Sequence, residues 1–365
     1  MKKYTALLLA LLLTLSLTAC GQTEDTGDTE WEYPAAFAGL ETLVEQAQAE
    51  GSLTVYGSCP AAYLTAACET FETLFNVRVS YQQVSDQAVL DKLSKPGRPG
   101  ADVWFGADSG ALEQAASMGG LTAYVPVAAA GLSDSDFAGA DGQWYGVAVD
   151  PLGLMVNTAS LKAMEIGAPE DWADLTELEY WELVWLPEYD TTEGRLLAQA
   201  AWDAFGDKAE KYLLELDENV AQYTEDGDPA AKYVGTGECV VAVGLLSSGA
   251  AQRLENSYDD IRLVTPRSGT PYVLNGSAIL RGTAHSAAAQ LWMEFVLSPT
   301  CQALAAMNGW YVWPTVENVS LPEDLAQLNV DLDGLTCRLP MGEDAEALDS
   351  LIDAVQTVLN PPVES

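Results

Sequence analysis

Short runs rich in β-branched and aromatic residues alternate with longer segments whose apolar positions recur at helical spacing. In the helix expected over 60–75, for example, Leu64, Cys68, Phe71 and Phe75 fall on one face. In the first half of the chain, strands are expected over 52–58, 77–82 and 101–106, and helices over 37–49, 60–75, 86–93 and 110–118. A βαβαβα series of this kind favours a parallel sheet with right-handed crossovers.

A second series of strands and helices follows Trp144. The apolar run 146–157 is broken by Asp150-Pro151, and because proline disturbs strand pairing, two extended pieces with a change of direction are expected there. Later strands are expected over 183–186, 238–244, 261–265 and 272–279, and helices over 158–164, 191–205, 207–216 and 286–297, the last being the final long helix. The predicted fold class is α/β, with mixed, mostly parallel sheets flanked by helices.

The first twenty residues have the pattern of a signal peptide. Lys2 and Lys3 precede an apolar stretch that is shorter than the ~20 residues needed to span a bilayer. The ending Leu-Thr-Ala-Cys resembles a bacterial lipobox, which would make Cys20 the lipid-bearing first residue of the mature chain. The alternative is a plain secretory signal cut before Cys20. Residues 21–36, polar and acidic, are expected to form a flexible tether.

The charge balance narrows the function classes. The chain has 54 Asp and Glu against 16 Lys and Arg, a formal net charge of -38, while 48% of its residues are hydrophobic and can build a core. An acidic surface repels phosphate backbones, so no nucleic-acid partner is expected. The single histidine, His285, excludes a multi-histidine metal site and is expected at the surface or as a helix cap. No enzyme activity, cofactor or metal site is expected, although a surface hydrolase built on a pair of acids stays open.

Cysteine spacing limits the disulfides. Beyond Cys20 there are five cysteines, so at least one stays unpaired. A helix over 60–75 would separate Cys59 and Cys68 by ~13 Å of helical rise, beyond the reach of a disulfide. The one remaining candidate bridge joins Cys301 and Cys337.

The order of segments resembles the extracellular solute-binding proteins of bacterial ABC importers, in the cluster that includes ferric-iron, thiamine and phosphonate or sugar-phosphate binders. No single motif is diagnostic of this family, but the order and spacing of several segments taken together are fairly specific to it. They are GSLTVYGS, ADVWFGAD, MGGLTAYVP, WYGVAVDPLGLMVN, APEDWADL, GECVVAVGLL and GSAILRGTAHSAAAQLWMEFVLSPTCQALAA, which together span most of 51–313.

The resemblance implies a two-lobed, type II periplasmic-binding-protein fold with a solute held between the lobes. The first lobe would contain 50–148 and 272–365, the second 150–270, with hinge crossings near 147–151 and 271–275. The lobes would close on the solute, and the closed form would dock on a membrane permease without a chemical step. The protein would be a monomer, lipid-anchored outside the cytoplasmic membrane or periplasmic. A membrane-tethered module that reports its ligand to a sensor is the alternative.

Candidate ligand-binding residues follow the predicted strands, because ligands of such sheets lie beyond the carboxyl ends of the strands. Ser58 and Cys59 offer backbone N–H groups and a hydroxyl to an anion, unless Ser58 only caps the next helix. Asp108 is suited to a cationic or hydroxyl group, or to capping the helix after it. The best candidate in the second lobe is a helix start with hydroxyl donors, formed by Thr191, Thr192, Glu193 and Gly194.

The remaining candidates bear on the identity of the ligand. Ser247 and Ser248 occupy the region in which ferric-iron binders of the resembled cluster carry two adjacent tyrosines that ligate the metal. The chain contains no Tyr-Tyr pair, which argues against Fe(III). Asp150 is either a turn residue or a ligand acceptor. Tyr272, like Tyr56, Trp310 and Tyr311, is either a wall of the cleft or a core residue. Phosphonates, phosphorylated small molecules and thiamine-like compounds are the expected ligand classes.

Overall fold

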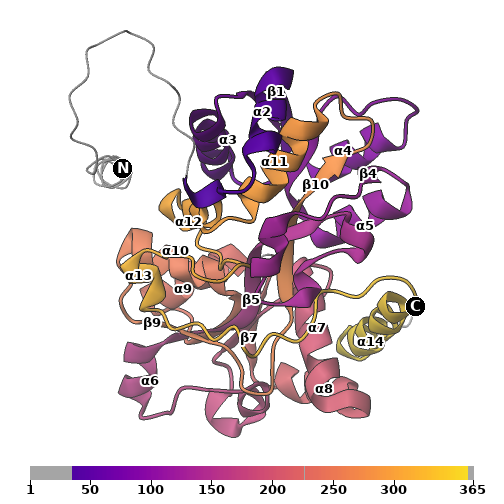
Figure 1. Cartoon of the computed structure of the whole chain (residues 1–365). Coiled ribbons are helices and arrows are strands. Elements are labelled where there is room, and N and C mark those ends of the chain that lie inside the picture. The colour runs from indigo at the N-terminus through magenta and orange to yellow at the C-terminus, as the bar shows by residue number, and fades with distance from the viewer. Residues whose placement is uncertain (1–34, 226, 361–365) are drawn as a thin grey trace, which may run out of the picture. The chain divides into compact units, whose positions relative to one another are not determined.

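The computed structural model describes residues 35–225 and 227–360, so Cys20, the predicted signal peptide and most of the predicted tether lie outside the described residues. The chain divides into two units, 1–42 and 43–365, and all strands lie in the second. The strands are β1 Ser52–Gly57, β2 Arg78–Gln83, β3 Val103–Asp108, β4 Leu121–Thr122, β5 Tyr145–Asn157, β6 Val184–Pro187, β7 Val220–Thr224, β8 Val241–Leu245, β9 Ile261–Val264 and β10 Tyr272–Leu280 (Figure 1).

Helices account for most of the rest of the described chain. The α-helices are α2 Glu41–Glu50, α3 Ala61–Phe75, α4 Asp86–Leu93, α5 Ser109–Ser117, α6 Thr158–Met164, α7 Thr192–Phe205, α8 Ala209–Asp217, α9 Gly227–Thr236, α10 Leu246–Asn256, α11 Ser286–Val296, α12 Pro299–Met307, α13 Glu323–Ala326 and α14 Glu343–Leu359. The 3₁₀ turns are η1 Ala35–Phe37, η2 Val127–Gly131, η3 Ser135–Phe137, η4 Ala140–Gly142, η5 Trp172–Thr176, η6 Leu178–Tyr180 and η7 Gly206–Lys208. None of the helices in the described ranges is long and apolar enough to cross a membrane.

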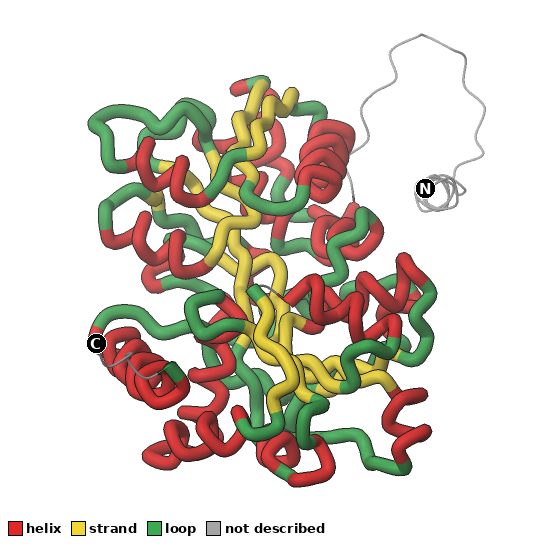
Figure 2. The backbone as a smooth tube through the Cα atoms, turned by 180° about the vertical axis from the view of Figure 1, so that it is seen from behind, coloured by secondary structure: helices red, strands yellow, loops and turns green. Residues whose placement is uncertain are grey.

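The strands follow one path in the order β2-β1-β3-β10-β5-β8-β6-β7, with β4 beside β10 and β9 beside β5. We call β1–β4, β10 and the first half of β5 the first sheet, and β6–β9 and the second half of β5 the second sheet. Strands β2, β1 and β3 are parallel to one another, as are β7, β6 and β8, whereas β10 is antiparallel to β3 and β5, and β8 and β9 are antiparallel to β5. Figure 2 shows the strands passing without a break from one sheet into the other. The predicted two-lobed α/β class is confirmed.

Strand β5 corrects one prediction. The expected change of direction at Asp150-Pro151 is wrong, since β5 runs unbroken and buried from Tyr145 to Asn157. Leu152 donates its N–H to the Pro271 carbonyl at 3.0 Å, and pairing with β8 begins at Leu152. Because N–H groups alternate between the two edges of a strand, the missing N–H of Pro151 falls on the edge that β8 has not yet reached. Proline therefore costs no ladder bond at this position.

Separate sets of helices cover the two sheets. Helices α3, α11 and α12 lie with the first sheet, where Phe105 of β3 and Phe71 of α3 contact Trp292 of α11 with ring centroids 5.3 Å and 5.2 Å apart. Helix α7 packs on β5, β6 and β8 of the second sheet, and α8 packs on α7. Large buried aromatic rings of this kind supply much of the hydrophobic stabilisation of each lobe.

C-terminal helices were expected within 272–365, but the position of α14 was not predicted, although its pattern is helical. Apolar residues at helical spacing join the core of the second sheet, namely Leu348, Leu351, Ile352 and Val355. The helix packs on α7 and α8 (Figure 1), although it belongs to the range 272–365 that was expected to return to the first lobe. Residues 286–297 are therefore not the last long helix.

The cysteines correct a second prediction. Cys59, Cys68, Cys239, Cys301 and Cys337 are all free thiols, so the expected Cys301–Cys337 bridge is wrong. Cys301 is buried in α12, where its sulfur lies 3.8 Å from the Tyr63 hydroxyl, whereas the Cys337 sulfur lies 3.3 Å from the Asp203 carboxylate. Cys301 thus belongs to the helices over the first sheet, whereas Cys337 lies in an irregular segment beside α7 of the second sheet, a separation that sequence spacing does not show.

Candidate functional site

The carboxyl ends of the parallel strands in the two sheets approach each other along β5. Through β10, Asp108 at the end of β3 is level with Ala148 of β5, and Leu245 at the end of β8 pairs with Leu152 of β5. Four residues of β5 therefore separate the two levels, about 13 Å at the usual rise of a strand. Asp150 lies in the middle of this stretch. The region beyond the strand ends, on both sides of Asp150, is the candidate site.

Ser58 follows β1 and is held by the first sheet. Its hydroxyl donates to the Val84 carbonyl at 3.0 Å and accepts from Trp104 Nε1 at 2.9 Å. The helix after it, α3, has Pro60 at its N-cap, so the interpretation of Ser58 as a helix cap is wrong. The hydroxyl instead fixes the strand end against its neighbours.

Cys59 is buried behind that strand end. Only 2% of the residue is exposed, and a Cβ atom built on Gly106 would come within 2.4 Å of the Cys59 Cβ, so the two segments are in close contact. Burial raises the pKa of the Cys59 thiol to about 12, which keeps it protonated. At this position Cys59 is a packing residue, and any contact with a solute would have to come from its backbone.

Two carboxylates meet at the ends of β2 and β3. Asp108 caps α5 by accepting the Gly110 N–H at 2.8 Å, as one of its two predicted roles required. Its own N–H donates to Asp86 Oδ2 at 3.1 Å, and Asp86 Oδ1 is buried without a hydrogen-bond partner in the described part of the chain. Burial raises the pKa of both carboxyls, and this effect outweighs the lowering by the Ser58 hydroxyl beside Asp86 and by the backbone N–H groups that the two carboxyls accept.

Asp86 is a residue that the sequence analysis missed. The sequence contains a pattern that could have identified it. Ser85-Asp86 starts a helix directly after a predicted strand, and Asp108 was chosen as a candidate because it has the same kind of position. An unsatisfied buried carboxylate oxygen favours a hydrogen-bond donor such as a hydroxyl group.

Asp150 and Ser247, both predicted site residues, are brought into contact. Asp150 Oδ1 accepts the Ser247 N–H at 3.1 Å, and Oδ2 accepts the Ser247 hydroxyl. Ser247 lies in the first turn of α10, so the carboxylate occupies the positive end of that helix. Asp150 is 5% exposed and lies within a strand, which rules out the turn role.

The start of α7 takes the form that the sequence predicted. Thr191 is the N-cap, its hydroxyl accepting the Gly194 N–H at 3.0 Å and donating to the Glu188 carbonyl at 2.7 Å. Thr192 and Glu193 form the first turn. Gly194 is buried against the preceding loop, where a Cβ would lie 2.0 Å from the Glu188 oxygen. The close approach explains why this position carries glycine.

Tyr272 does not lie with the residues at the strand ends. It lines a cavity of about 710 Å³ between α5, α7 and residues 337–348, which we call the C-terminal cavity. Ser58, Cys59, Thr191 and Ser247 are not among its lining residues. The structure therefore divides the predicted residues into a strand-end group and the C-terminal cavity.

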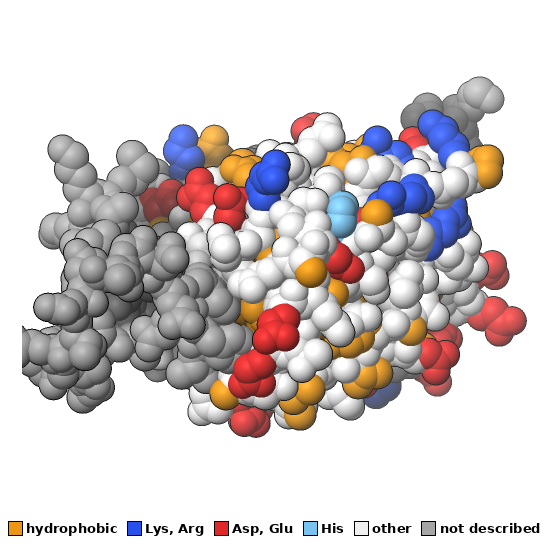
Figure 3. Space-filling model, turned by 45° about the horizontal axis from the view of Figure 1, so that its top comes forward, with side chains coloured by type: hydrophobic (Ala, Val, Ile, Leu, Met, Phe, Trp, Pro, Cys, Tyr) orange, Lys and Arg blue, Asp and Glu red, His pale blue; other side chains and the backbone are white. Residues whose placement is uncertain are grey.

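His285 is placed between a serine and an aspartate. Its Nε2 lies 3.2 Å from Ser52 Oγ and its Nδ1 lies 2.9 Å from Asp102 Oδ2, and 29% of the histidine side chain reaches the surface. Figure 3 shows the histidine on a face where Lys and Arg side chains also gather. The order of groups is that of a serine hydrolase triad.

The surroundings of this arrangement favour a structural role. It lies at the amino ends of β1 and β3, opposite to the ends that carry the candidate site. Asp102 also accepts the Thr54 N–H at 2.9 Å and the Thr283 hydroxyl at 2.7 Å, so it ties the start of α11 to both strands. His285 is at the N-cap position of α11 but makes no side-chain cap bond, so the capping role expected for it is wrong.

No group of three or more His, Cys, Asp or Glu side chains is placed to hold a metal ion in the ranges 35–225 and 227–360. In the position of the tyrosine pair of the resembled iron binders, α10 begins with Leu246, Ser247 and Ser248. The donor set at the site is thus hydroxyls, backbone N–H groups and carboxylates.

Comparison with known proteins identifies the family. The family model for bacterial extracellular solute-binding proteins matches residues 99–333. An uncharacterized protein of Haemophilus influenzae is 29% identical over 279 residues, which cover 74% of this chain and 80% of that protein.

Solved structures agree with this assignment. The periplasmic binding protein AfuA of Actinobacillus pleuropneumoniae, solved with exogenous fructose-6-phosphate, is 26% identical with a TM-score of 0.62, covering 86% of this chain and 99% of AfuA. Trichodesmium FutA, solved with iron and citrate, shares the fold at 16% identity with a TM-score of 0.71, covering 84% of this chain and 99% of FutA. The chain therefore belongs to the bacterial extracellular solute-binding proteins, the non-enzymatic solute-capturing components of ABC importers.

Proposed function

We propose that the chain captures a small phosphorylated or phosphonate solute between its two lobes and delivers it to the permease of an ABC importer. The observation that carries the proposal is the single strand β5, shared by both sheets, which sets the strand ends of the two lobes on either side of Asp150. A site divided between two sheets that are joined by so few connections suits capture by closure.

The connections between the sheets are the proposed hinge. One is β5 at residues 150–152, a second is the segment 265–271 between β9 and β10, and a third is the stretch between α12 of the first lobe and α14 on the second. The Thr270 hydroxyl donates to the Leu152 carbonyl at 2.7 Å, which holds the first two crossings together. We assign 50–148 to the first lobe and 150–270 to the second, with β10, α11 and α12 returning to the first.

The ligand class rests on two supports. Helix α7 begins after a parallel strand with hydroxyl residues, and helix N-termini favour anions, whereas the start of α10 already holds the Asp150 carboxylate. AfuA, at 26% identity, was solved with fructose-6-phosphate bound. Asp86 and Asp108 of the first lobe would then accept hydrogen bonds from the hydroxyl groups of the solute. A thiamine-like ligand remains the second choice, and the absent tyrosine pair disfavours Fe(III).

Binding of fructose 6-phosphate is expected to raise the melting temperature of the mature protein by several degrees. A ligand at a hundredfold excess over its Kd adds about 2.7 kcal/mol to the free energy of unfolding. Differential scanning fluorimetry with fructose 6-phosphate, a phosphonate and thiamine measures this shift. Fructose is the matched control, and an equal shift with fructose would show that the phosphate group contributes nothing.

The variant Asp150→Asn sharpens this test. Asparagine keeps an acceptor for the Ser247 N–H but removes a negative charge, so an anionic group bound near α10 should bind about fivefold tighter. Titration calorimetry measures the change, with Asp260→Asn on the surface as the control. Weaker binding by Asp150→Asn would instead mean that the carboxylate contacts a donor group of the solute.

We further propose that a lipid on Cys20 holds the protein at the outer face of the cytoplasmic membrane. In cells, Cys20→Ala is expected to move the protein from the membrane fraction to the soluble fraction, because the lipid is the anchor and the described helices do not span a bilayer. Fractionation and labelling with a fatty-acid probe measure this. A Cys20→Ala protein that stays in the membrane fraction would contradict the lipid anchor, and Cys337→Ala is the matched control.

A role in reporting ligand to a sensor would use the same closure. Growth on the bound solute as sole source, compared between cells with and without the gene for this chain, separates the two roles. Loss of growth supports import, whereas unchanged growth with altered gene expression supports the sensor.

A further inference from the structure

The C-terminal cavity is lined by a tyrosine whose hydroxyl has no partner in the described protein. Tyr272 is 4% exposed and lines the cavity, yet its hydroxyl makes no hydrogen bond to any described residue. Its ring packs edge-on against Phe137, with centroids 5.7 Å apart, which fixes its orientation. The hydroxyl oxygen is not among the buried side-chain atoms without a partner, so it reaches the cavity space and is available to a ligand. Burial raises the pKa of Tyr272 to about 12, so the group is a neutral phenol.

The charges that line the cavity are mostly negative. Glu113, Asp136, Asp203 and Asp344 face one basic group, Arg338. The Arg338 guanidinium is already engaged, since it lies 5.0 Å from the Trp144 ring centroid and 3.8 Å from Glu113 Oε1.

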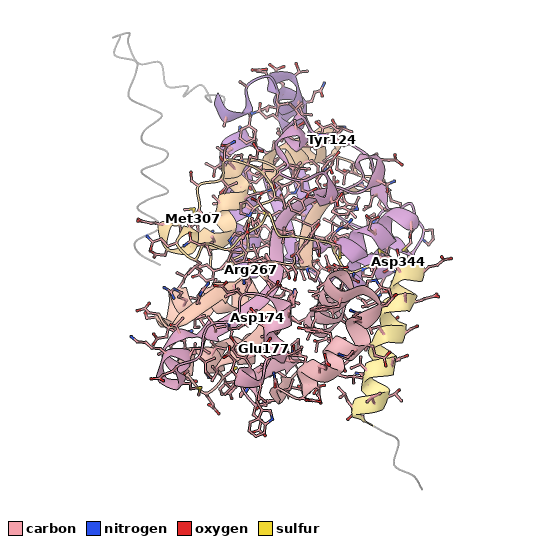
Figure 4. The ribbon with its side chains drawn as sticks, turned by 90° about the horizontal axis from the view of Figure 1, so that it is seen from below. Tyr124, Asp174, Glu177, Arg267, Met307 and Asp344 are labelled. Carbon is pink, nitrogen blue, oxygen red and sulfur yellow. The ribbon has the colours of Figure 1, made fainter. Side chains whose placement is uncertain are left out.

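Two of these carboxylates have no partner. Asp203 is occupied by the Thr336 hydroxyl, the Cys337 thiol and the Gln199 amide. Asp136 and Asp344, by contrast, make no ion pair or side-chain hydrogen bond within the described part of the chain. Asp344 lies in the first turn of α14 (Figure 4). The cavity therefore offers two unpaired carboxylates and an unpaired phenol oxygen.

We propose that the C-terminal cavity binds a small organic di- or polyamine. One ammonium group donates to the Tyr272 oxygen and faces Asp136, and a second is held by Asp344 at the other side of the cavity. Trp202 of α7, which is 43% exposed, supplies an aromatic surface to the cation or its methylene chain. A volume of about 710 Å³ is in the range of small-molecule sites.

The residues that line this site differ from those of the strand-end group, although Ser109 and Gly110 of the cavity directly follow Asp108. The cavity is formed by α5 of the first lobe, α7 of the second, and the segment 337–348 that passes between them. An amine bound there would contact both lobes at once, so its occupation would affect their closure.

The test is titration calorimetry of the mature protein with putrescine and spermidine in about 150 mM NaCl, where loose association with a strongly acidic protein is screened. The matched probes are 1,4-butanediol, which has the same length without charge, and succinate, which carries the opposite charge. Saturable binding of putrescine with no binding of the other two is expected. Equal binding of butanediol, or putrescine heats that never saturate, would overturn the proposal.

Variants locate the site. Tyr272→Phe removes only the hydroxyl and is expected to weaken putrescine binding about tenfold, the usual cost of a lost hydrogen bond to a charged group. Asp136→Asn and Asp344→Asn, both at exposed positions that tolerate substitution, are expected to weaken it several-fold, and Asp260→Asn to leave it unchanged. Unchanged affinity in Tyr272→Phe and Asp136→Asn would overturn the assignment. Fructose 6-phosphate titrated into the same samples reports on the strand-end site separately.

Discussion

Replacing Asp102 by alanine is expected to lower the free energy of unfolding by about 3–5 kcal/mol, the range seen when one partner of a buried charged network is removed. The Asp102 side chain is 1% exposed and accepts from the Thr54 N–H, the Thr283 hydroxyl and His285 Nδ1 at 2.7–2.9 Å. Alanine would leave these part-buried donors without the acceptor that they share. Urea denaturation at neutral pH measures the loss.

The Asp102 carboxylate also makes the stability of the protein depend on pH, and the direction of this dependence follows from its pKa. Burial raises the pKa of Asp102, but the hydrogen bonds from Thr283, His285 and Thr54 outweigh it and hold the pKa below the ordinary 3.8. A carboxyl with a lowered pKa contributes stability above its unfolded pKa and loses it as the pH falls through its folded pKa. The stability difference between the wild type and Asp102→Ala should therefore narrow below about pH 4.

Two control variants accompany this experiment. Asp102→Asn keeps one acceptor oxygen and should lose less stability than the alanine variant. Asp333→Ala, at an exposed position, should change stability by less than about 0.5 kcal/mol. A loss of similar size in Asp102→Ala and Asp333→Ala would show that the Ser52–His285–Asp102 arrangement holds nothing together.

Replacing Gly194 by alanine is expected to reduce both stability and solute binding. The new Cβ would lie 2.0 Å from the Glu188 oxygen and 2.7 Å from the Tyr189 Cα, which are backbone atoms that cannot turn away. Overpacking of this kind costs about 3 kcal/mol. Relief requires the first turn of α7 to move away from the loop before it, which also breaks the Thr191 cap. A solute group held at this helix start should then bind at least tenfold more weakly.

The control for this substitution is Gly167→Ala, because a Cβ at Gly167 meets nothing within 4 Å. Its stability and affinity should match those of the wild type. Calorimetry with fructose 6-phosphate on folded Gly194→Ala protein, below its melting temperature, separates the two effects. Full affinity in a destabilised variant would remove the start of α7 from the proposed site.

Local signals in the sequence predicted local structure well. Helices α4 and α6 begin and end at the predicted residues, and Thr191 caps α7 as its position before an amphipathic run required. Helix ends and caps of this kind are determined by residues within a few positions along the chain, so the local sequence is sufficient to predict them.

Features that depend on distant segments were not predictable in the same way. From the sequence, Pro151 is expected to interrupt a strand. Only the position at which β8 begins to pair shows that its missing N–H removes no hydrogen bond from the ladder. Cys301 and Cys337 looked like a bridge because nothing in their spacing reveals that one lies with the helices over the first sheet and the other beside α7 of the second. The contact between Asp150 and Ser247 joins residues 97 positions apart, and the site residue Asp86 gains its meaning only from Asp108 beside it.

The return of β10 to the first sheet has a consequence for the order of folding. The middle of that sheet needs β10, because β3 pairs with residues 275–279 on one edge, yet the whole second lobe is synthesised between them. Until β10 arrives, β3 has an open edge and Trp104 and Phe105 lack part of their covering. Contacts of such long sequence separation are slow to form. During synthesis the first sheet therefore cannot be completed until residues 275–279 have left the ribosome, after the strands of the second lobe.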